Sequence, residues 1–369
     1  MAQEAAIRKM RKLVLLGFMA TFIFSCQEKK ETTINKEIQE AAETSLLQQL
    51  QRHNAQHGTA VVMEVATGEI KAIANLGRDE DGNYKESYNY ALGESIEPGS
   101  TFQLMTYMAM FEDGMLKYND SIDNGFTGSV TFFGKRVDDD GRSETMGWLT
   151  VEKAFALSSN IAVTKFVDKH YRGNEKKFID RLYSMNLNQK LDLEVSGEGE
   201  PEIKYPGSHF WTELSLTQMA SGYEVRMAPI HVLTFYNAVA NDGKMVKPIF
   251  IKGEKGKREK VQVEKKQIAS LATINDAKRM LEAVVEYGTA KRIKTDAYKI
   301  AGKTGTIQTS NNGKERKYYA SFAGYFPADC PKYSCIVSIY APTENGFGGG
   351  VVAAPAFREI ADKIMNSEK

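Results

Sequence analysis

The amino-acid sequence predicts a mixed α/β fold of the α+β kind, in which one antiparallel sheet is flanked by helices and carries a helical subdomain. Three observations along the 369 residues lead to this expectation. Two strand-like runs come early, a long stretch of helical periodicity follows, and three more strand-like runs precede a closing helix. Strands gathered near both ends of a chain, instead of alternating with helices, favour one antiparallel sheet.

The first elements of the body are a helix and a hairpin. Residues 38–54 carry apolar side chains at helical spacing. The runs 59–65 and 69–76 have strand-like apolar patterns, and Ala66-Thr67-Gly68 between them is a turn signal. We therefore expect the folded body to begin near residue 38, with a helix followed by two paired strands.

The middle of the chain is dominated by helical patterns and its end by strands. Helices are expected at 101–113, 150–171, 174–185, 215–226, 229–242 and 274–287. Later strands are expected at 298–306, 317–326 and 334–341, before a closing helix at 353–365.

The composition excludes several classes of protein. The 48 Lys and Arg residues nearly balance 47 Asp and Glu residues, and this argues against a nucleic-acid partner, which usually selects a basic excess. With 42% hydrophobic and 26% charged residues and nine prolines, the chain is not collagen-like, disordered or a multi-span membrane protein. Length alone permits two domains, but one large domain is the simpler expectation.

The first residues have the pattern of an export signal. A basic stretch at 7–12 precedes an apolar run at 13–24, which is shorter than the ~20 residues that a membrane-spanning helix needs. The run ends at Ser25-Cys26 and resembles a bacterial lipobox, which would place a lipid on Cys26. A simple signal peptide or a short membrane anchor is the alternative, and Met10 is a second candidate start to Met1.

These patterns divide the chain into three expected parts. Residues 1–25 would be a signal peptide of the lipoprotein type, 26–37 a polar tether, and 38–369 one domain. The protein is therefore expected to be exported and periplasm-facing, held at a membrane by its lipid.

Two cysteines remain if Cys26 carries lipid. Cys330 and Cys335 bracket a short polar segment between two strand-like runs. In an oxidising periplasm they could form a disulfide across a hairpin, or they could remain two free thiols. The sequence leaves both alternatives open.

The usual catalytic signatures are missing from the sequence. None of the five histidines lies in a Gly-x-Ser-x-Gly or His-Glu-x-x-His motif, so a Ser-His-Asp hydrolase or a zinc protease is not indicated. The glycine-rich stretch 346–350 lacks the Lys-Ser/Thr of a nucleotide-binding loop. We therefore expect no metal and no cofactor.

A more informative pattern surrounds Ser100. Pro98-Gly99 breaks the chain, and an apolar helix starts immediately afterwards, so Ser100 lies at the N-terminus of a buried helix. The N–H groups and dipole there favour negative charge, as an oxyanion formed by serine attack would require. The alternative is structural, because Ser100 and Gln103 also have the spacing of a capping box.

Two further motifs favour the catalytic interpretation of Ser100. Leu157-Ser158-Ser159-Asn160 lies between two helical segments, and Ala301-Gly302-Lys303-Thr304-Gly305-Thr306 lies on an expected strand. With Ser100 they follow the order of the S-x-x-K, S-x-N and K-T-G motifs of serine acyltransferases that react with β-lactams.

The chain from about residue 38 onward resembles the transpeptidase domain of class B penicillin-binding proteins, particularly those of Bacteroidetes. The likeness implies a β-lactamase/transpeptidase-like fold, without cofactor, that binds peptidoglycan stem peptides and β-lactams. Beyond the three motifs it is carried by the segments Val61–Ala74, Glu97–Phe102, Ser159–Val163, Gly288–Lys291, Ala301–Thr306 and Gly324–Asp329.

The resemblance also implies roles for single residues. Ser100 would be the acyl-forming nucleophile that attacks the penultimate D-Ala carbonyl of a stem peptide. Ser158 would relay a proton and Asn160 would hold the substrate backbone. The N–H groups of Ser100 and Thr306 would form the oxyanion hole.

The third motif would bind the substrate along its strand. Lys303 and Thr304 would hold the terminal carboxylate or its β-lactam equivalent. Gly305 would let the strand approach the substrate closely, because it has no side chain. Lys303, if desolvated beside Ser158, could also act as a base.

One position departs from the family pattern. The lysine that accepts the serine proton is replaced by Gln103, whose carboxamide has no accessible basic pKa. Losing a general base typically costs roughly 10²- to 10⁴-fold in rate.

Three hypotheses follow. The first is a D,D-transpeptidase that crosslinks peptidoglycan, weakened by Gln103 and working with other cell-wall synthesis proteins. The second is a non-catalytic module that binds penicillin or stem peptides without turnover. The third, a β-lactam hydrolase, ranks last because no Glu-x-x-Leu-Asn deacylating element lies between Asn160 and Lys303.

Overall fold

The computed structural model describes residues 31–253, 261–311 and 315–368, and the chain divides into two compact units. One unit is Met1–Thr32 with Ile251–Glu259, of which residues 31, 32 and 251–253 are described. Within it Thr32 forms a β-bridge with Ile251, and Lys252 Nζ lies 2.8 Å from the Glu31 carboxylate. The expected export signal and Cys26 lie outside the described residues.

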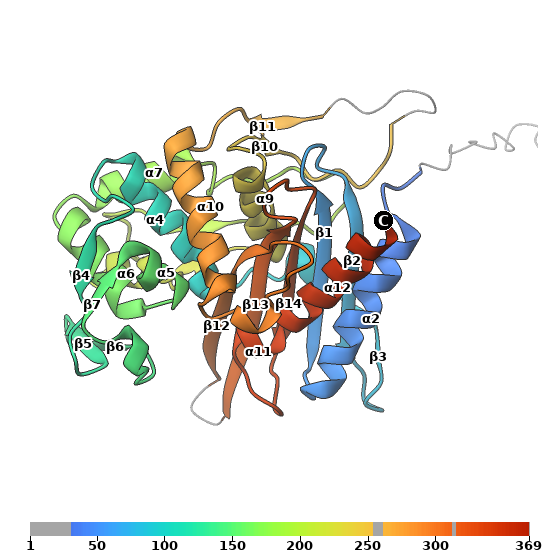
Figure 1. Ribbon diagram of the computed structural model, residues 1–369, viewed down its shortest axis with the longest axis horizontal. Helices are drawn as coiled ribbons and strands as arrows, with labels where there is room; N and C mark the ends of the chain where they lie inside the picture. The colour runs from blue at the N-terminus through green and yellow to red at the C-terminus, as the bar shows by residue number, and fades with distance from the viewer. Residues whose placement is uncertain (1–30, 254–260, 312–314, 369) are drawn as a thin grey trace, which may run out of the picture. The chain divides into compact units, whose positions relative to one another are not determined.

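The second unit, Thr33–Phe250 with Lys260–Lys369, is built around a six-stranded sheet in which every neighbouring pair is antiparallel. The strand order is β12-β13-β14-β1-β2-β3, so the last three strands of the chain lie beside the first three (Figure 1). The sequence prediction of one antiparallel sheet is confirmed, with β3 as an additional strand. The strands are β1 His57–Glu64, β2 Ile70–Arg78, β3 Tyr84–Glu86, β12 Ala301–Asn311, β13 Glu315–Phe326 and β14 Tyr333–Tyr340.

Helices cover both faces of this sheet, and this is why its central strands are apolar throughout. Helices α2 (Lys36–Arg52) and α12 (Ala354–Ser367) lie in front of the sheet in Figure 1, and α9 (Pro229–Ala240) packs behind it. Val61 and Val62 on β1 are completely buried although successive side chains of a strand point to opposite faces. Each such side chain contributes about 1.5–3 kcal/mol to stability.

β3 pairs with only the last part of β2, and the Gln39 side chain covers the outer edge of β2 at Ile73. The Gln39 carboxamide accepts a hydrogen bond from the Ile73 N–H and donates one to the Ile73 carbonyl, both at 2.9 Å. It occupies the place of a neighbouring peptide group. Covering an edge in this way blocks pairing with other chains.

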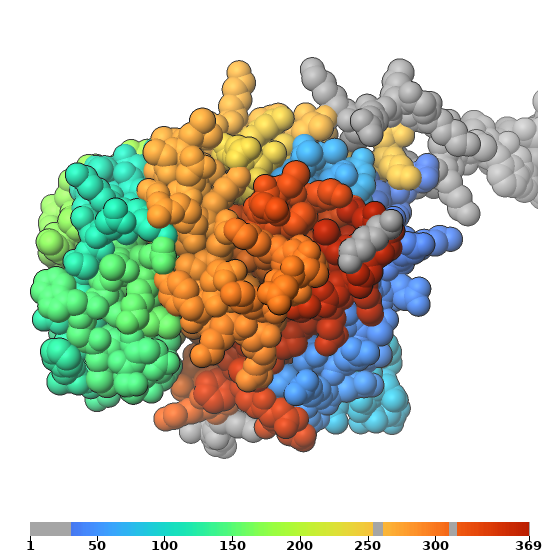
Figure 2. All heavy atoms as spheres, viewed as in Figure 1, coloured from blue at the N-terminus to red at the C-terminus, as the bar shows by residue number. Residues whose placement is uncertain are grey.

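A helical subdomain lies beside β12, coloured teal and green next to the orange α10 in Figure 2. It contains most of the remaining helices and two small two-stranded sheets, β4 with β7 and the hairpin of β5 with β6. The remaining helices are α3 Tyr90–Gly93, η1 Gly99–Phe102, α4 Gln103–Glu112, η2 Ser143–Thr145, α5 Val151–Ala156, α6 Asn160–Tyr171, α7 Glu175–Ser184, α8 Ser215–Ala220, α10 Leu271–Glu286, η3 Lys291–Ile293 and α11 Gly349–Val352. The short strands are β4 Ser121–Asp123, β5 Ser129–Phe132, β6 Lys135–Asp138, β7 Trp148–Thr150, β8 Glu202–Ile203, β9 Val225–Arg226, β10 Met245–Val246 and β11 Val263–Lys265.

Several predicted boundaries were wrong for identifiable reasons. The helix expected at 150–171 is two helices, because Ser158 has a left-handed φ of 54° that a helix cannot contain. The helix expected at 215–226 ends at Ala220, before Gly222 with φ 79°. The strand expected at 298–306 is Ala301–Asn311, paired with β13 along its whole length. The short strands of the subdomain are too brief to give a periodic signal.

The structure also settles the cysteine alternatives. Cys330 is an exposed free thiol in the turn between β13 and β14, and Cys335 is a buried free thiol on β14. Burial raises the pKa of the Cys335 thiol above its usual value, so this group is unreactive. The disulfide alternative is therefore not adopted.

No helix in the part of the chain that the structure describes has the length and apolarity to cross a bilayer.

Candidate active site

The three sequence motifs meet where the β12 edge of the sheet faces the helical subdomain (Figure 1). Ser100 lies on η1, directly before α4, and Ser158 lies in the turn between α5 and α6. Lys303 comes from β12 and donates a hydrogen bond to the Ser158 hydroxyl at 2.8 Å. Residues that are 145 positions apart in the sequence are thus in direct contact.

Lys303 is a fully buried amine, with an exposed fraction of 0%. Besides Ser158, its Nζ contacts the Thr304 carbonyl oxygen at 3.2 Å and lies 5.4 Å from the centre of the Phe155 ring. Burial, and secondarily the positive charge of Arg142, hold the pKa of Lys303 well below its ordinary value. An amine in this state can accept a proton.

Gln103 connects the other members of the site. Its Nε2 donates to Ser100 Oγ at 3.4 Å and to Asn160 Oδ1 at 3.2 Å. Its Oε1 accepts a hydrogen bond from the Ser158 hydroxyl at 3.4 Å. The side chain is completely buried, and one amide therefore orients both hydroxyls and the asparagine.

The capping-box interpretation of Ser100 and Gln103 is wrong. Gln103 contacts the Ser100 hydroxyl, and no side chain forms a cap hydrogen bond at the start of η1 or of α4. Ser100 is half-buried, so its hydroxyl keeps access to the surface. At the first turn of a helix its N–H group has no intrahelical partner.

The remaining residues of the third motif line β12 beside Lys303. Thr304 is 5% exposed, and its hydroxyl is 2.6 Å from the Thr289 hydroxyl. Thr306 is half-buried, and its hydroxyl accepts a hydrogen bond from the Gly349 N–H at 3.0 Å. Along this strand Lys303 is fully buried against Ser158, whereas Thr306 is half-buried.

Glycines permit the close approach of these segments. A Cβ atom at Gly305 would lie 2.3 Å from Ser321 Oγ and 3.0 Å from a methyl carbon of Thr101 on η1. A Cβ atom at Gly222 would lie 2.1 Å from the Gly99 carbonyl oxygen. The missing side chain of Gly305 thus allows β12 to pack against η1, a role that the sequence did not predict.

Two residues near the site were missed by the motifs. Asp139 and Arg142 follow β6 and bond to the chain on either side of Ser158. The only signal in the sequence is the unusual run Asp138-Asp139-Asp140 ahead of the second motif.

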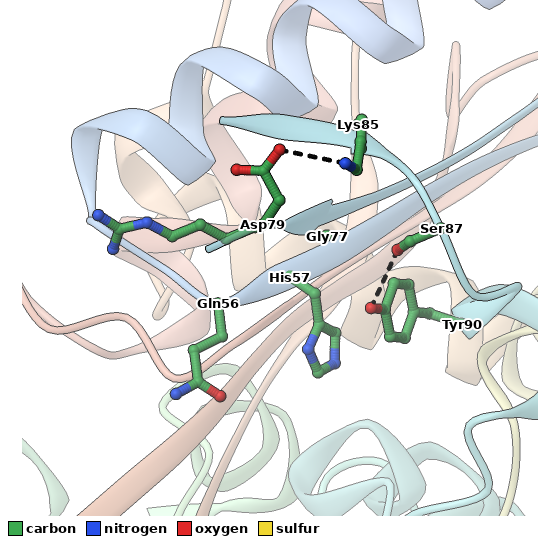
Figure 3. Close-up of a pocket in the computed structure, with 8 residues that line it drawn as sticks. Gln56, His57, Gly77, Asp79, Lys85, Ser87 and Tyr90 are labelled. Carbon is green, nitrogen blue, oxygen red and sulfur yellow. Dashed lines mark hydrogen bonds and ion pairs between the residues drawn. The ribbon is translucent and has the colours of Figure 1, made fainter. Parts of the chain in front are cut away.

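A separate cavity of about 470 Å³ lies near the opposite edge of the sheet, where β1, β2 and β3 meet (Figure 3). None of the motif residues lines it. Its walls contain an ion pair of Asp79 with Lys85 at 3.2 Å and a hydrogen bond between Ser87 and Tyr90 at 3.2 Å. Its lining residues are Gln56, His57, Gly77, Arg78, Asp79, Lys85, Ser87 and Tyr90.

Within the described residues no group of three or more His, Cys, Asp or Glu side chains is arranged to hold a metal ion. The chemistry available at the motif site is that of a serine hydroxyl, a buried amine, a carboxamide and strand hydroxyls. On an antiparallel sheet beside a helical subdomain, this combination defines the class of the penicillin-recognising serine proteins.

The chain belongs to the penicillin-binding protein transpeptidase family. The family model described as "Penicillin binding protein transpeptidase domain" matches residues 58–362. The chain is 27% identical to penicillin-binding protein PbpB of Mycobacterium tuberculosis, covering 91% of this chain and 52% of that protein. It is 28% identical to the probable peptidoglycan D,D-transpeptidase PbpC of Pseudomonas aeruginosa, covering 89% of this chain and 57% of that protein. The chain thus spans little more than half the length of these relatives.

Solved structures have the same fold. Penicillin-binding protein 3 of Mycobacterium tuberculosis, complexed with aztreonam, superposes with a TM-score of 0.79 at 26% identity, covering 92% of this chain and 79% of that one. The apo transpeptidase domain of penicillin-binding protein 3 from Burkholderia pseudomallei gives 0.78 at 24% identity, covering 92% and 96%. The transpeptidase fold that the resemblance implied is confirmed.

Proposed function

We propose that this protein is a penicillin-binding D,D-transpeptidase that forms an acyl-enzyme at Ser100. Its substrates would be peptidoglycan stem peptides ending in D-Ala-D-Ala, and β-lactams would acylate the same serine. The observation that carries this proposal is the buried Lys303 amine at 2.8 Å from the Ser158 hydroxyl, in a cluster that Gln103 joins to Ser100. Relatives named as peptidoglycan D,D-transpeptidases and a related structure complexed with aztreonam support it.

Substrate binding would place the scissile carbonyl in front of Ser100. The hydroxyls of Thr304 and Thr306 would receive the terminal carboxylate along β12. The Asn160 amide would hold the peptide backbone, and the N–H groups of Ser100 and Thr306 would stabilise the oxyanion. Gly305 would keep β12 seated against η1 while the substrate lies along it.

Acylation then needs a group that accepts the Ser100 proton. Gln103 cannot do so, because a carboxamide is not basic near neutral pH. The site contains the buried amine of Lys303, which contacts the Ser158 hydroxyl. Gln103 joins that hydroxyl to Ser100. The Ser100 oxygen would bond to the carbonyl carbon while its proton passes through Ser158 to Lys303. The bond from that carbon to the nitrogen of the terminal D-Ala would then break, and the departing amine would take up the proton.

This route predicts a slow enzyme. The family lysine would stand directly beside the nucleophile, whereas the proton here must travel by way of a second hydroxyl. A misplaced general base loses much of its roughly 10²- to 10⁴-fold contribution, so acylation would continue at a reduced rate.

The test is intact-protein mass spectrometry of the full chain after incubation with a penicillin, followed by mapping of the modified peptide. A stoichiometric adduct on Ser100 is expected, and the matched Ser100→Ala variant should give none. An adduct that persists in Ser100→Ala would remove this serine as the nucleophile.

Gln103 also favours a second candidate function, a module that binds penicillin or stem peptides without turnover. Such a protein would show saturable, reversible binding of a fluorescent penicillin and no mass adduct after hours. The two candidates therefore give opposite outcomes in the same experiment.

We also propose export and lipid attachment at Cys26, on the sequence pattern of residues 7–26. The expected result is that the Cys26→Ala variant no longer incorporates labelled fatty acid and no longer partitions with membranes. Incorporation that is unaffected by this change would contradict the proposal.

A further inference from the structure

The turn that carries Ser158 has a conformation that must be held by its surroundings. Ser158 has φ 54°, in the left-handed region that residues other than glycine rarely adopt. Such a conformation persists only where neighbouring groups fix it. The neighbouring segment Asp138–Arg142, which we name the clamp loop, bonds to this turn from both sides.

Asp139 holds the side of the turn that leads into α6. Its carboxylate accepts hydrogen bonds from the N–H groups of Asn160 at 2.7 Å and Ile161 at 3.2 Å. The same carboxylate accepts from the Ser159 hydroxyl at 2.6 Å and from Asn124 at 3.0 Å. Asp139 is completely buried, and a carboxylate at a helix N-terminus also benefits from the helix dipole.

Arg142 holds the side of the turn that comes from α5. Its guanidinium donates to the carbonyl oxygens of Leu157 and Ser158, the latter at 3.3 Å. A third hydrogen bond, from Nε to the Asp139 carbonyl at 2.8 Å, ties the guanidinium to the clamp loop itself. The planar fork of arginine can make these contacts together, and the single amine of lysine cannot.

We infer that Asp139 and Arg142 are positioning residues that hold the Ser158 hydroxyl against the Lys303 amine and Asn160 against Gln103. This inference rests on the proposed acylation at Ser100, because it assigns the clamp loop to the same proton route. Neither residue belongs to the three motifs. Loss of either set of bonds would release the turn, and small displacements of reacting groups can cost roughly 100-fold in rate.

Arg142 also has an electrostatic effect on the Lys303 amine, and this effect distinguishes a positioning residue from one that only stabilises the fold. The groups in contact with the Lys303 amine are the Ser158 hydroxyl, the Thr304 carbonyl and the Phe155 ring, and none of these titrates near neutral pH. The charged groups nearby are those of the clamp loop, and the Asp139 carboxylate is fully engaged by four hydrogen bonds. The Arg142 charge helps to lower the pKa of Lys303, so removing it should raise that pKa.

The first experiment measures the rate of acylation by a fluorescent penicillin against pH, in the full chain and three variants. Arg142→Lys keeps the charge and loses the fork, so the rate should fall roughly 10- to 100-fold with an unchanged pH midpoint. Arg142→Gln loses both, so the rate should fall and the alkaline rise in rate should shift to higher pH. Arg279→Gln is the matched control, because Arg279 lies on α10 with 59% of its side chain exposed and pairs with Asp276, outside the clamp loop.

The Asp139 bonds are tested by a pair of substitutions. Asp139→Asn keeps an oxygen that can accept from the Asn160 and Ile161 amides, whereas Asp139→Ala does not. Acylation should fall in Asp139→Ala and recover in part in Asp139→Asn, measured as the limiting acylation rate separately from penicillin affinity. Equal rates in Asp139→Ala and the unmodified protein would overturn the inference.

If Ser100 is not acylated, the proposed function is contradicted, but the role of the clamp loop can still be tested by a second measurement. The amine of Lys303 is titrated by NMR in lysine-labelled protein, with Lys303→Met to assign the signal. Its midpoint should be higher in Arg142→Gln than in the unmodified protein or in Arg142→Lys. An identical midpoint in Arg142→Gln, in protein that retains its circular dichroism spectrum, would refute the electrostatic role of Arg142.

Discussion

Gln103 offers the sharpest test of the proposed mechanism, through the substitution Gln103→Lys. The carboxamide Nε2 lies 3.4 Å from Ser100 Oγ, and its Oε1 lies 3.4 Å from the Ser158 hydroxyl. A lysine side chain extends about one bond further, so its amine would reach both hydroxyls. In a site that already lowers the pKa of Lys303, two neighbouring amines would oppose each other's charge, and one would stay neutral.

The size of the effect follows from the value of a general base. A well-placed base contributes roughly 10²- to 10⁴-fold, which is about 3 to 5 kcal/mol in barrier height. If Lys303 already accepts the proton through Ser158, part of this gain is present, and the increase should lie near the lower figure. If the present site has no working base, the increase should lie near the upper one.

The assay is the second-order rate constant for acylation of the full chain by a labelled penicillin, measured by quenched gel fluorescence. Gln103→Met is the matched control, because it has a similar length, cannot accept a proton and loses the same amide hydrogen bonds. Gln103→Met should be no faster than the unmodified protein. An unchanged rate in Gln103→Lys, with thermal stability preserved, would show that the missing base does not limit this site.

Three further predictions address Lys303, Gly222 and the cysteines. Lys303→Met should strongly slow acylation yet raise the melting temperature, and more so at lower pH. The reason is that the buried Lys303 amine has a lowered pKa, so the unfolded chain binds more protons than the folded protein does. The free energy of unfolding therefore falls as the pH decreases below the ordinary lysine pKa, and Lys303→Met removes this loss. A melting temperature of Lys303→Met that drops equally at all pH values would contradict this. Gly222→Ala should destabilise the protein by more than about 1 kcal/mol in urea unfolding, because φ is 79° and the new Cβ would lie 2.1 Å from the Gly99 carbonyl oxygen; a neutral effect would show that η1 can move away. Thiol labelling should modify Cys330 in the native protein and Cys335 only after unfolding, and rapid native labelling of Cys335 would show that its strand opens.

The strands of the sheet illustrate what local patterns can establish. The apolar runs at 59–65, 69–76, 317–326 and 334–341 correspond to β1, β2, β13 and β14 with boundaries within two residues. β1 and β14 are buried on both faces, so their composition is strongly constrained. The three sequence motifs were recognisable by resemblance, since the family pattern has given residue types at given spacings, with Gln103 as the one departure.

The elements that the sequence missed depend on distant partners. The left-handed Ser158 and the end of α8 near Gly222 require contacts with the clamp loop and with Gly99, which lie elsewhere in the chain. The spacing of Ser100 and Gln103 was equally compatible with a capping box. Only the folded structure shows that the amide side chain turns toward the Ser100 hydroxyl and away from the backbone N–H.

The sequence by itself therefore determined the fold class, through local periodicity, and the family with its motif residues, through the resemblance of its motifs and segments to a known family. The lowered pKa of Lys303 and the support of Ser158 became visible only in the tertiary structure. The pKa of Lys303 is lowered by burial and by the charge of Arg142, and the turn at Ser158 is held by hydrogen bonds from Arg142 and Asp139, which follow a hairpin elsewhere in the chain. A pKa and a strained turn are properties of the surroundings of a residue, and those surroundings exist only after the chain has folded.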